Sequence, residues 1–120
     1  MHHAPPESDW KAFRKLREVT IQRFCQRVFD ELEQLRENGA KTSYERYLDV
    51  HRLLQTRDEE LGIAFDNPRR SQMMVQLAAI YAHELLEPEE FARFSTFTRQ
   101  AVELFAETVG WLLEPARSTE

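Results

Sequence analysis

The sequence has very little of the residues that build covalent, metal-bound or membrane-embedded frameworks. Cys25 is its only cysteine, which excludes an internal disulfide, and no CxxC or Cys/His spacing surrounds it that would hold zinc. No run of about 18 apolar residues occurs, so no segment is predicted to span a membrane. The N-terminus, which includes the adjacent His2 and His3, lacks the apolar stretch of a signal peptide. We therefore expect a cytoplasmic protein, and the two histidines enter no site prediction.

Glycine and proline are also scarce, with three and five among 120 residues. Leu, Glu, Arg, Gln and Ala are abundant instead, and these residues lose little conformational freedom in a helix. A hydrophobic content of 42% with eight Phe and two Trp excludes intrinsic disorder for most of the chain. The length suits one hydrophobic core. We predict a single helical domain over residues 8–114, between disordered tails at 1–7 and 115–120.

Capping signals place the first two helices. The first is predicted from Ser8 to the segment ENG, where Gly39 would take the left-handed conformation that ends many helices. Thr42 and Glu45 have the spacing of a capping box, in which each side chain bonds the other residue's backbone N–H. The second helix is therefore predicted from this box to about Phe65.

Two prolines mark the starts of the remaining helices, because proline fits the first helical turn. We predict a third helix from Pro68 to about Leu86 and a fourth from Pro88 to about Leu113. The connections are only a few residues long, so neighbouring helices must fold back on one another. The predicted fold is all-α, an antiparallel up-down four-helix bundle with a long first helix.

Charged residues fall on the apolar faces of these helices. At about 100° per residue, His51 and Asp58 lie in the middle of the second helix's apolar face, and Arg17 and Arg70 lie within those of the first and third. Glu84 lies at the edge of the third. A buried carboxylate needs a cation or several donors, so we predict a polar cluster of these five residues. Three interpretations remain open: a structural network that fixes helix register, a ligand-binding or proton-handling pocket, or an error in helix phase.

Sequence patterns for catalysis and metal binding are weak. The segment HELLE, residues 83–87, resembles a zinc-binding HExxH helix only in its first half, because Glu87 replaces the second histidine. No ExxH pair and no GxGxxG, GxxxxGK or GxSxG motif occurs. Cys25 lies beside the core stripe, where a thiol is inert. We expect no metal, no cofactor and no catalytic residues, which favours a non-enzymatic protein.

Basic residues gather at the start of the first helix. The segment WKAFRKLR contains Lys11, Arg14 and Lys15, which could contact RNA phosphates, an anionic surface or an acidic partner helix, or could simply be solvated. Arg69 in the predicted third helix's first turn could hold an anion or pair locally. The net charge of −5 repels nucleic acid at long range, so nucleic acid is the least favoured partner.

Some apolar residues lie outside the predicted core stripes and form a candidate dimer interface. They are Leu16, Val19 and Phe29 in the first helix, and Phe97, Leu104 and Trp111 in the fourth. Such surplus indicates a wider core or a subunit contact. We predict a homodimeric, non-enzymatic interaction or regulatory module. The alternatives are a small-ligand-binding protein or enzyme with a polar pocket between helices, and a nucleic-acid-associated factor that uses the basic segment.

Overall fold

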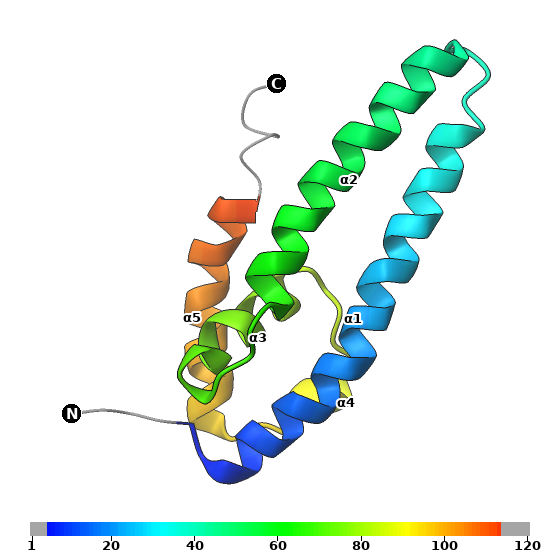
Figure 1. Cartoon of the computed structure of the whole chain (residues 1–120). Coiled ribbons are helices and arrows are strands. Elements are labelled where there is room, and N and C mark those ends of the chain that lie inside the picture. The colour runs from blue at the N-terminus through cyan, green and yellow to red at the C-terminus, as the bar shows by residue number, and fades with distance from the viewer. Residues whose placement is uncertain (1–4, 114–120) are drawn as a thin grey trace.

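Helices account for nearly all of the secondary structure. The computed structural model describes residues 5–113, with side chains up to residue 108, and this part contains no strand. The all-helical class is confirmed. No helix in this range is both long and apolar enough to cross a bilayer. The helices, shown in Figure 1, are α1 (Glu7–Arg36), α2 (Ser43–Phe65), the 3₁₀ turn η1 (Arg70–Gln72), α3 (Met73–Ala82), α4 (Pro88–Phe91) and α5 (Thr96–Leu113).

The capping box between the first two helices is confirmed. The Thr42 hydroxyl accepts a hydrogen bond from the Glu45 N–H at 3.1 Å, and the Glu45 carboxylate accepts one from the Thr42 N–H at 2.9 Å. The predicted left-handed Gly39 is wrong, because no glycine of the described chain has a positive φ. α1 ends earlier, at Arg36, and the chain turns through a hydrogen bond from the Lys41 N–H to the Asn38 carbonyl.

The third and fourth predicted helices are shorter than expected. Asn67 has a φ of 49° and Arg69 is extended, so the third helix does not begin at Pro68. Glu84, with a φ of 58°, follows the end of α3. The fourth helix is divided into α4 and α5, because the Ser95 hydroxyl accepts from the Thr98 N–H at 3.3 Å and starts a new helix.

A buried carboxylate joins the start of α1 to the start of α5. Asp9 is only 2% exposed. Its carboxylate accepts hydrogen bonds from the Ser95 N–H at 3.1 Å, the Ser95 hydroxyl at 2.7 Å and the Thr98 hydroxyl at 2.6 Å. The negative charge also lies at the positive end of the α5 dipole. The sequence analysis missed this contact, which links residues far apart in the chain.

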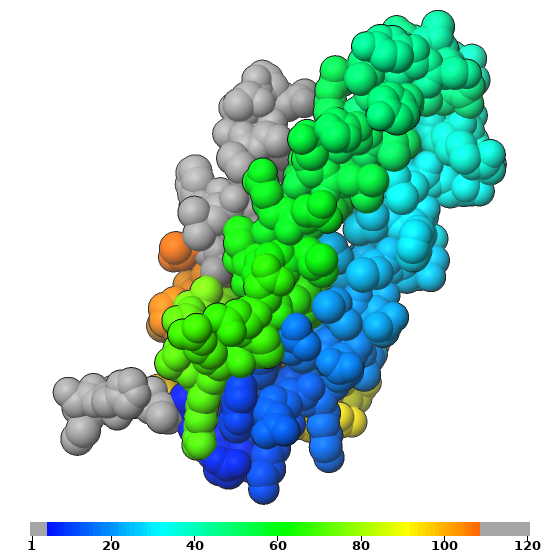
Figure 2. Space-filling model, in the orientation of Figure 1, coloured from blue at the N-terminus to red at the C-terminus, as the bar shows by residue number. Residues whose placement is uncertain are grey.

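The core occupies only one end of the molecule. All buried side chains of the described part lie in residues 5–24 and 60–102, and none lies between Cys25 and Glu59. We call residues 25–59 the hairpin extension. It contains the α1–α2 connection, which lies at the end of the molecule away from α3 and α4 (Figure 1) and projects from the body in the space-filling view (Figure 2). The principal dimensions, 55 × 27 × 24 Å, reflect this projection. The largest fully buried side chains include Phe13, Phe65, Phe94, Met73, Leu77 and Ile80.

Candidate functional site

The residues of the predicted polar cluster do not come together. His51 and Asp58 are exposed on α2, so their predicted burial is wrong. Arg17 donates to the Phe65 carbonyl, at 2.6 Å from Nη2. Arg70 donates to the Pro5 carbonyl at 2.8 Å and to Glu7. Glu84 is exposed. Any binding role for these five residues stays a prediction.

The phase of α2 explains the error. Its less exposed stripe runs one position earlier than predicted and includes charged residues with partners on α1. Arg57 forms a two-point ion pair with Glu31 of α1, at 2.8 and 3.0 Å, and a further pair with Glu60 at 2.8 Å. These bonds let the charged Arg57 lie between the helices. For His51 and Asp58, the third interpretation of the polar cluster, an error in the predicted helix phase, is the correct one.

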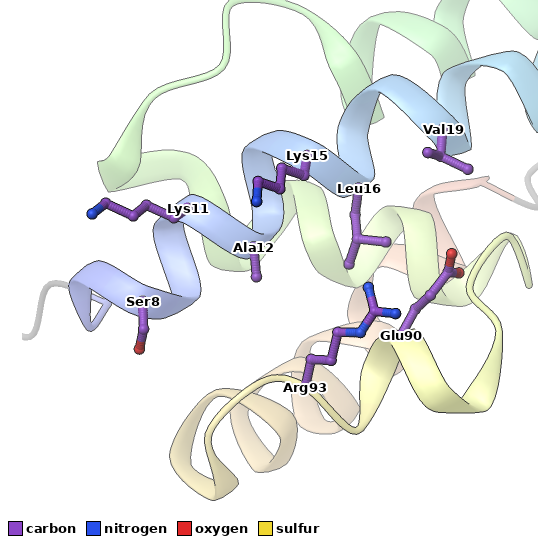
Figure 3. Close-up of a pocket in the computed structure, with 8 residues that line it drawn as sticks. All are labelled: Ser8, Lys11, Ala12, Lys15, Leu16, Val19, Glu90 and Arg93. Carbon is purple, nitrogen blue, oxygen red and sulfur yellow. The ribbon is translucent and has the colours of Figure 1, made fainter.

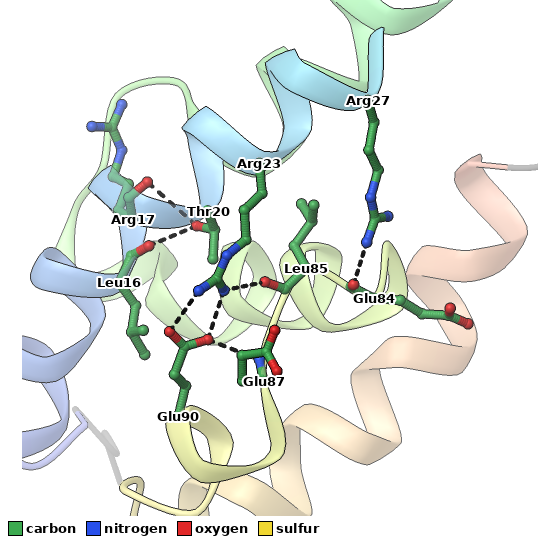
Figure 4. Close-up of polar contacts among 9 residues, drawn as sticks. All are labelled: Leu16, Arg17, Thr20, Arg23, Arg27, Glu84, Leu85, Glu87 and Glu90. Carbon is green, nitrogen blue, oxygen red and sulfur yellow. Dashed lines mark hydrogen bonds and ion pairs between the residues drawn. The ribbon is translucent and has the colours of Figure 1, made fainter. Parts of the chain in front are cut away.

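Arginines of α1 donate hydrogen bonds to backbone carbonyls at the end of α2 and directly after the end of α3. Arg17 bonds the last residue of α2, as described above. Arg23 donates to the Leu85 carbonyl at 2.7 Å, and Arg27 donates to the carbonyls of His83 and Glu84 at 2.5 Å each. Both Arg23 and Arg27 project from α1 toward the α3–α4 connection (Figure 4). The last carbonyls of a helix lack partners within it, so these cations supply hydrogen bonds there and interact favourably with the negative end of the helix dipole.

Arg23 also holds α4 against α1. Its guanidinium forms two hydrogen bonds with the Glu90 carboxylate, at 2.7 and 2.9 Å, and Glu90 accepts another from the Glu87 N–H at 2.8 Å (Figure 4). The hydrogen bond from Arg23 is the main reason that the pKa of Glu90 lies below its ordinary value. Glu90 is therefore ionised at neutral pH, and its charge is balanced by Arg23.

Beside this ion pair lies a groove between α1 and the α4 region. Its volume is about 400 Å³. Arg93 and Glu90 extend from the α4 side toward α1 (Figure 3). Within the described chain, neither lysine of the groove nor Arg93 forms a salt bridge. We call this surface the α1/α4 groove, and its lining consists of Ser8, Lys11, Ala12, Lys15, Leu16, Val19, Glu90 and Arg93.

The predicted anion contacts fall in different places. Lys11 and Lys15 line the groove. Arg14 instead lies over the Trp10 ring, with its guanidinium carbon 5.9 Å from the ring centre, and Arg69 is exposed before η1. The sequence analysis missed Arg93, because its approach to α1 depends on the turn after α4. No local pattern would have indicated it.

The predicted dimer residues are also divided. Leu16 is 4% exposed and belongs to the core, so its assignment to a dimer interface is wrong. Val19, Phe29, Phe97 and Leu104 are exposed. The side chain of Trp111 lies outside the described residues. The apolar residues of the first helix that lay outside its predicted core stripe are therefore divided between the core and the surface.

His83 follows the end of α3 and is partly buried. Its ring packs edge-on against Phe24, with centroids 5.6 Å apart, and its Nε2 is buried without a hydrogen-bond partner. Burial lowers the pKa of His83, so its ring is neutral at pH 7. The described residues contain no group of three or more metal-binding side chains. Among the described residues, His83 is thus a packed aromatic ring that belongs to no such group.

Comparisons with known proteins assign no family. No protein-family model matches the chain, and the search found no similar protein among either the curated sequences or the solved structures. From the structure, the two candidate surfaces for binding are the α1/α4 groove and the hairpin extension.

Proposed function

We propose that this protein is a non-enzymatic interaction module that forms a homodimer through the hairpin extension. The observation that carries the proposal is the contrast between exposed apolar area and missing core in residues 25–59. No side chain in this segment is buried. Several of its apolar side chains are half-buried between α1 and α2, but four large ones are exposed: Phe29 by 63%, Tyr44 by 69%, Tyr47 by 67% and Leu54 by 39%.

Self-association would cover this surface. Fully burying one large apolar side chain contributes about 1.5–3 kcal/mol, and a symmetric dimer buries the same residues in both chains. The extension is already held in a defined geometry by the Arg57–Glu31 pair and by the bond from Arg46 to the Arg36 carbonyl. A preorganised surface loses less conformational entropy on binding than a mobile one. The proposal includes a regulatory role and a cytoplasmic location for the module. It also includes an antiparallel up-down arrangement of the main helices.

The ligand-pocket alternative needs convergence of the five residues that the sequence analysis grouped. Those residues instead contact separate helix ends or solvent, so no observation favours a polar pocket among them. The nucleic-acid alternative depends on the basic start of α1 and is tested with the groove below.

Light scattering coupled to size exclusion tests the dimer, over a range of protein concentrations. We expect a mass approaching twice the 14.3 kDa of one chain at high concentration. Phe29→Glu with Tyr47→Glu should restore the single-chain mass, because charged residues cannot be buried unpaired in the interface. Val75→Glu on α3 is the matched control, since Val75 is 41% exposed but outside the extension. A wild-type chain that stays monomeric at every concentration would contradict the proposal.

A further inference from the structure

We propose that the α1/α4 groove binds an acidic, amphipathic segment of a partner protein. This surface is separate from the hairpin extension, so the inference goes beyond self-association. It depends on the charges around the groove, on the apolar side chains within it and on the charge of the rest of the chain.

The lining of the groove carries more cations than carboxylates. Lys11, Lys15 and Arg93 are cationic, and all three side chains are exposed. The only carboxylate in the lining is Glu90, which forms two hydrogen bonds with Arg23. The groove therefore presents a net positive surface. Lys11 and Lys15 are one helical turn apart, about 6 Å along the α1 axis, which matches carboxylates spaced one turn apart on a partner helix.

Part of the groove lining is apolar. Ala12 and Leu16 point from α1 toward the α4 side (Figure 3), and Val19, which also lines the groove, is 43% exposed. Aliphatic side chains beside unpaired cations are suited to a segment that carries both carboxylates and apolar residues. A volume of about 400 Å³ accommodates a few anchoring side chains. The geometry thus favours an amphipathic peptide over a free small anion.

Nucleic acid is a poorer fit to the same surface. The lining contains no aromatic side chain, and recognition of single-stranded nucleic acid depends on aromatic rings that stack with bases. Trp10, which adjoins Lys11 in sequence, is in contact with Phe13 and Arg14. The whole chain has a net charge of −5, which repels a long polyanion. A short acidic segment can instead be directed to the local positive surface, because the acidic remainder disfavours other docking positions.

Selection from a random peptide library displayed on phage, with the full chain as bait, tests the inference. The selected peptides should contain Asp or Glu interleaved with Leu, Ile or Phe at helical spacing. A selected peptide, labelled for fluorescence anisotropy, should bind the Lys11→Glu, Lys15→Glu double variant at least about tenfold more weakly than the wild type, because two attractive charge contacts become repulsive. Val19→Asp should also weaken binding, and added salt should weaken binding to the wild type.

The double variant Arg14→Glu, Arg69→Glu provides the matched control. It makes the same change in net charge at two exposed arginines that neither line the groove nor belong to the hairpin extension. Its affinity should stay within about twofold of wild type if the effect is local to the groove. Circular dichroism verifies the helical fold of each variant. The groove variants should retain the dimer mass of the wild type, so failure of this inference is distinguishable from failure of the proposed dimer.

Three results would overturn the inference. One is a selection that yields no acidic peptides. Another is binding that the groove variants leave unchanged or that the control variant weakens equally. The third is a single-stranded RNA oligonucleotide that binds more tightly than the selected peptide and loses binding on substitution of Lys11 and Lys15, which would indicate a nucleic-acid site.

Discussion

Replacement of Asp9 by alanine should be among the most destabilising polar substitutions in this protein. The carboxylate accepts three hydrogen bonds from Ser95 and Thr98 at 2.6–3.1 Å, and the side chain of Thr98 is fully buried. Hydrogen bonds to a charged group contribute about 1.5–3 kcal/mol each, and removing the acceptor leaves donors without partners. The desolvation cost of the carboxylate disappears at the same time and offsets part of this loss. We expect a net decrease of about 2–4 kcal/mol in the free energy of unfolding.

Urea denaturation followed by circular dichroism measures this effect. With a dependence of about 2 kcal/mol per molar urea, the midpoint should fall by about 1–2 M. Asp9→Asn retains an acceptor oxygen of similar size and should cost less than Asp9→Ala. Glu103→Ala, which removes an exposed carboxylate from α5, is the control and should change stability by no more than about 0.5 kcal/mol. If Asp9→Ala were as mild as this control, the buried link between α1 and α5 would not contribute as described.

Three further predictions concern caps and titratable groups. Thr42→Ala should cost about 1 kcal/mol in urea denaturation, because it removes the hydroxyl of the capping box, and no measurable loss would contradict that role. The pKa of Glu90 is lowered in the folded chain, so at pH values above its ordinary pKa of 4.5 the ionised side chain contributes stability, which is lost as pH falls. Glu90→Gln should therefore be less stable than the wild type at pH 7 and should lose less stability on acidification. The pKa of His83 is lowered by burial from 6.5, so the stability linked to its neutral form is present above pH 6.5 and is lost as pH falls through the pKa of the folded chain. The free energy of unfolding should therefore differ less between pH 5 and pH 7.5 for His83→Gln than for the wild type. An equal difference in the two proteins would contradict this.

Local signals predicted the parts of the fold that depend on neighbouring residues. The Thr42–Glu45 box is a contact across three residues, and it correctly placed the start of α2. Pro88 likewise begins α4. The break between α4 and α5, within the predicted fourth helix, was missed, because Asp9 from the opposite end of the chain stabilises it through Ser95. Such a contact has no local pattern.

The candidate site shows the same division. Lys11 and Lys15 belong to the basic segment that the sequence indicated as a possible partner contact, whereas Arg93 reaches the groove only through tertiary packing. The inward face of α2 was misjudged because Tyr44 and Tyr47 have the helical spacing of core-facing apolar residues, although both are exposed. Tyrosine has an apolar ring and a polar hydroxyl, so its helical position does not identify a core face. Arg57, in contrast, lies between helices because Glu31 and Glu60 neutralise it.

The most direct test of the proposed module is hydrogen–deuterium exchange at two protein concentrations, one below and one above the dimer transition. A thin pair of helices without buried side chains should open readily in the monomer. We predict that the amides of the hairpin extension, residues 25–59, gain protection as concentration rises while those of α3 stay unchanged. Equal exchange from the extension at both concentrations would contradict association through this surface.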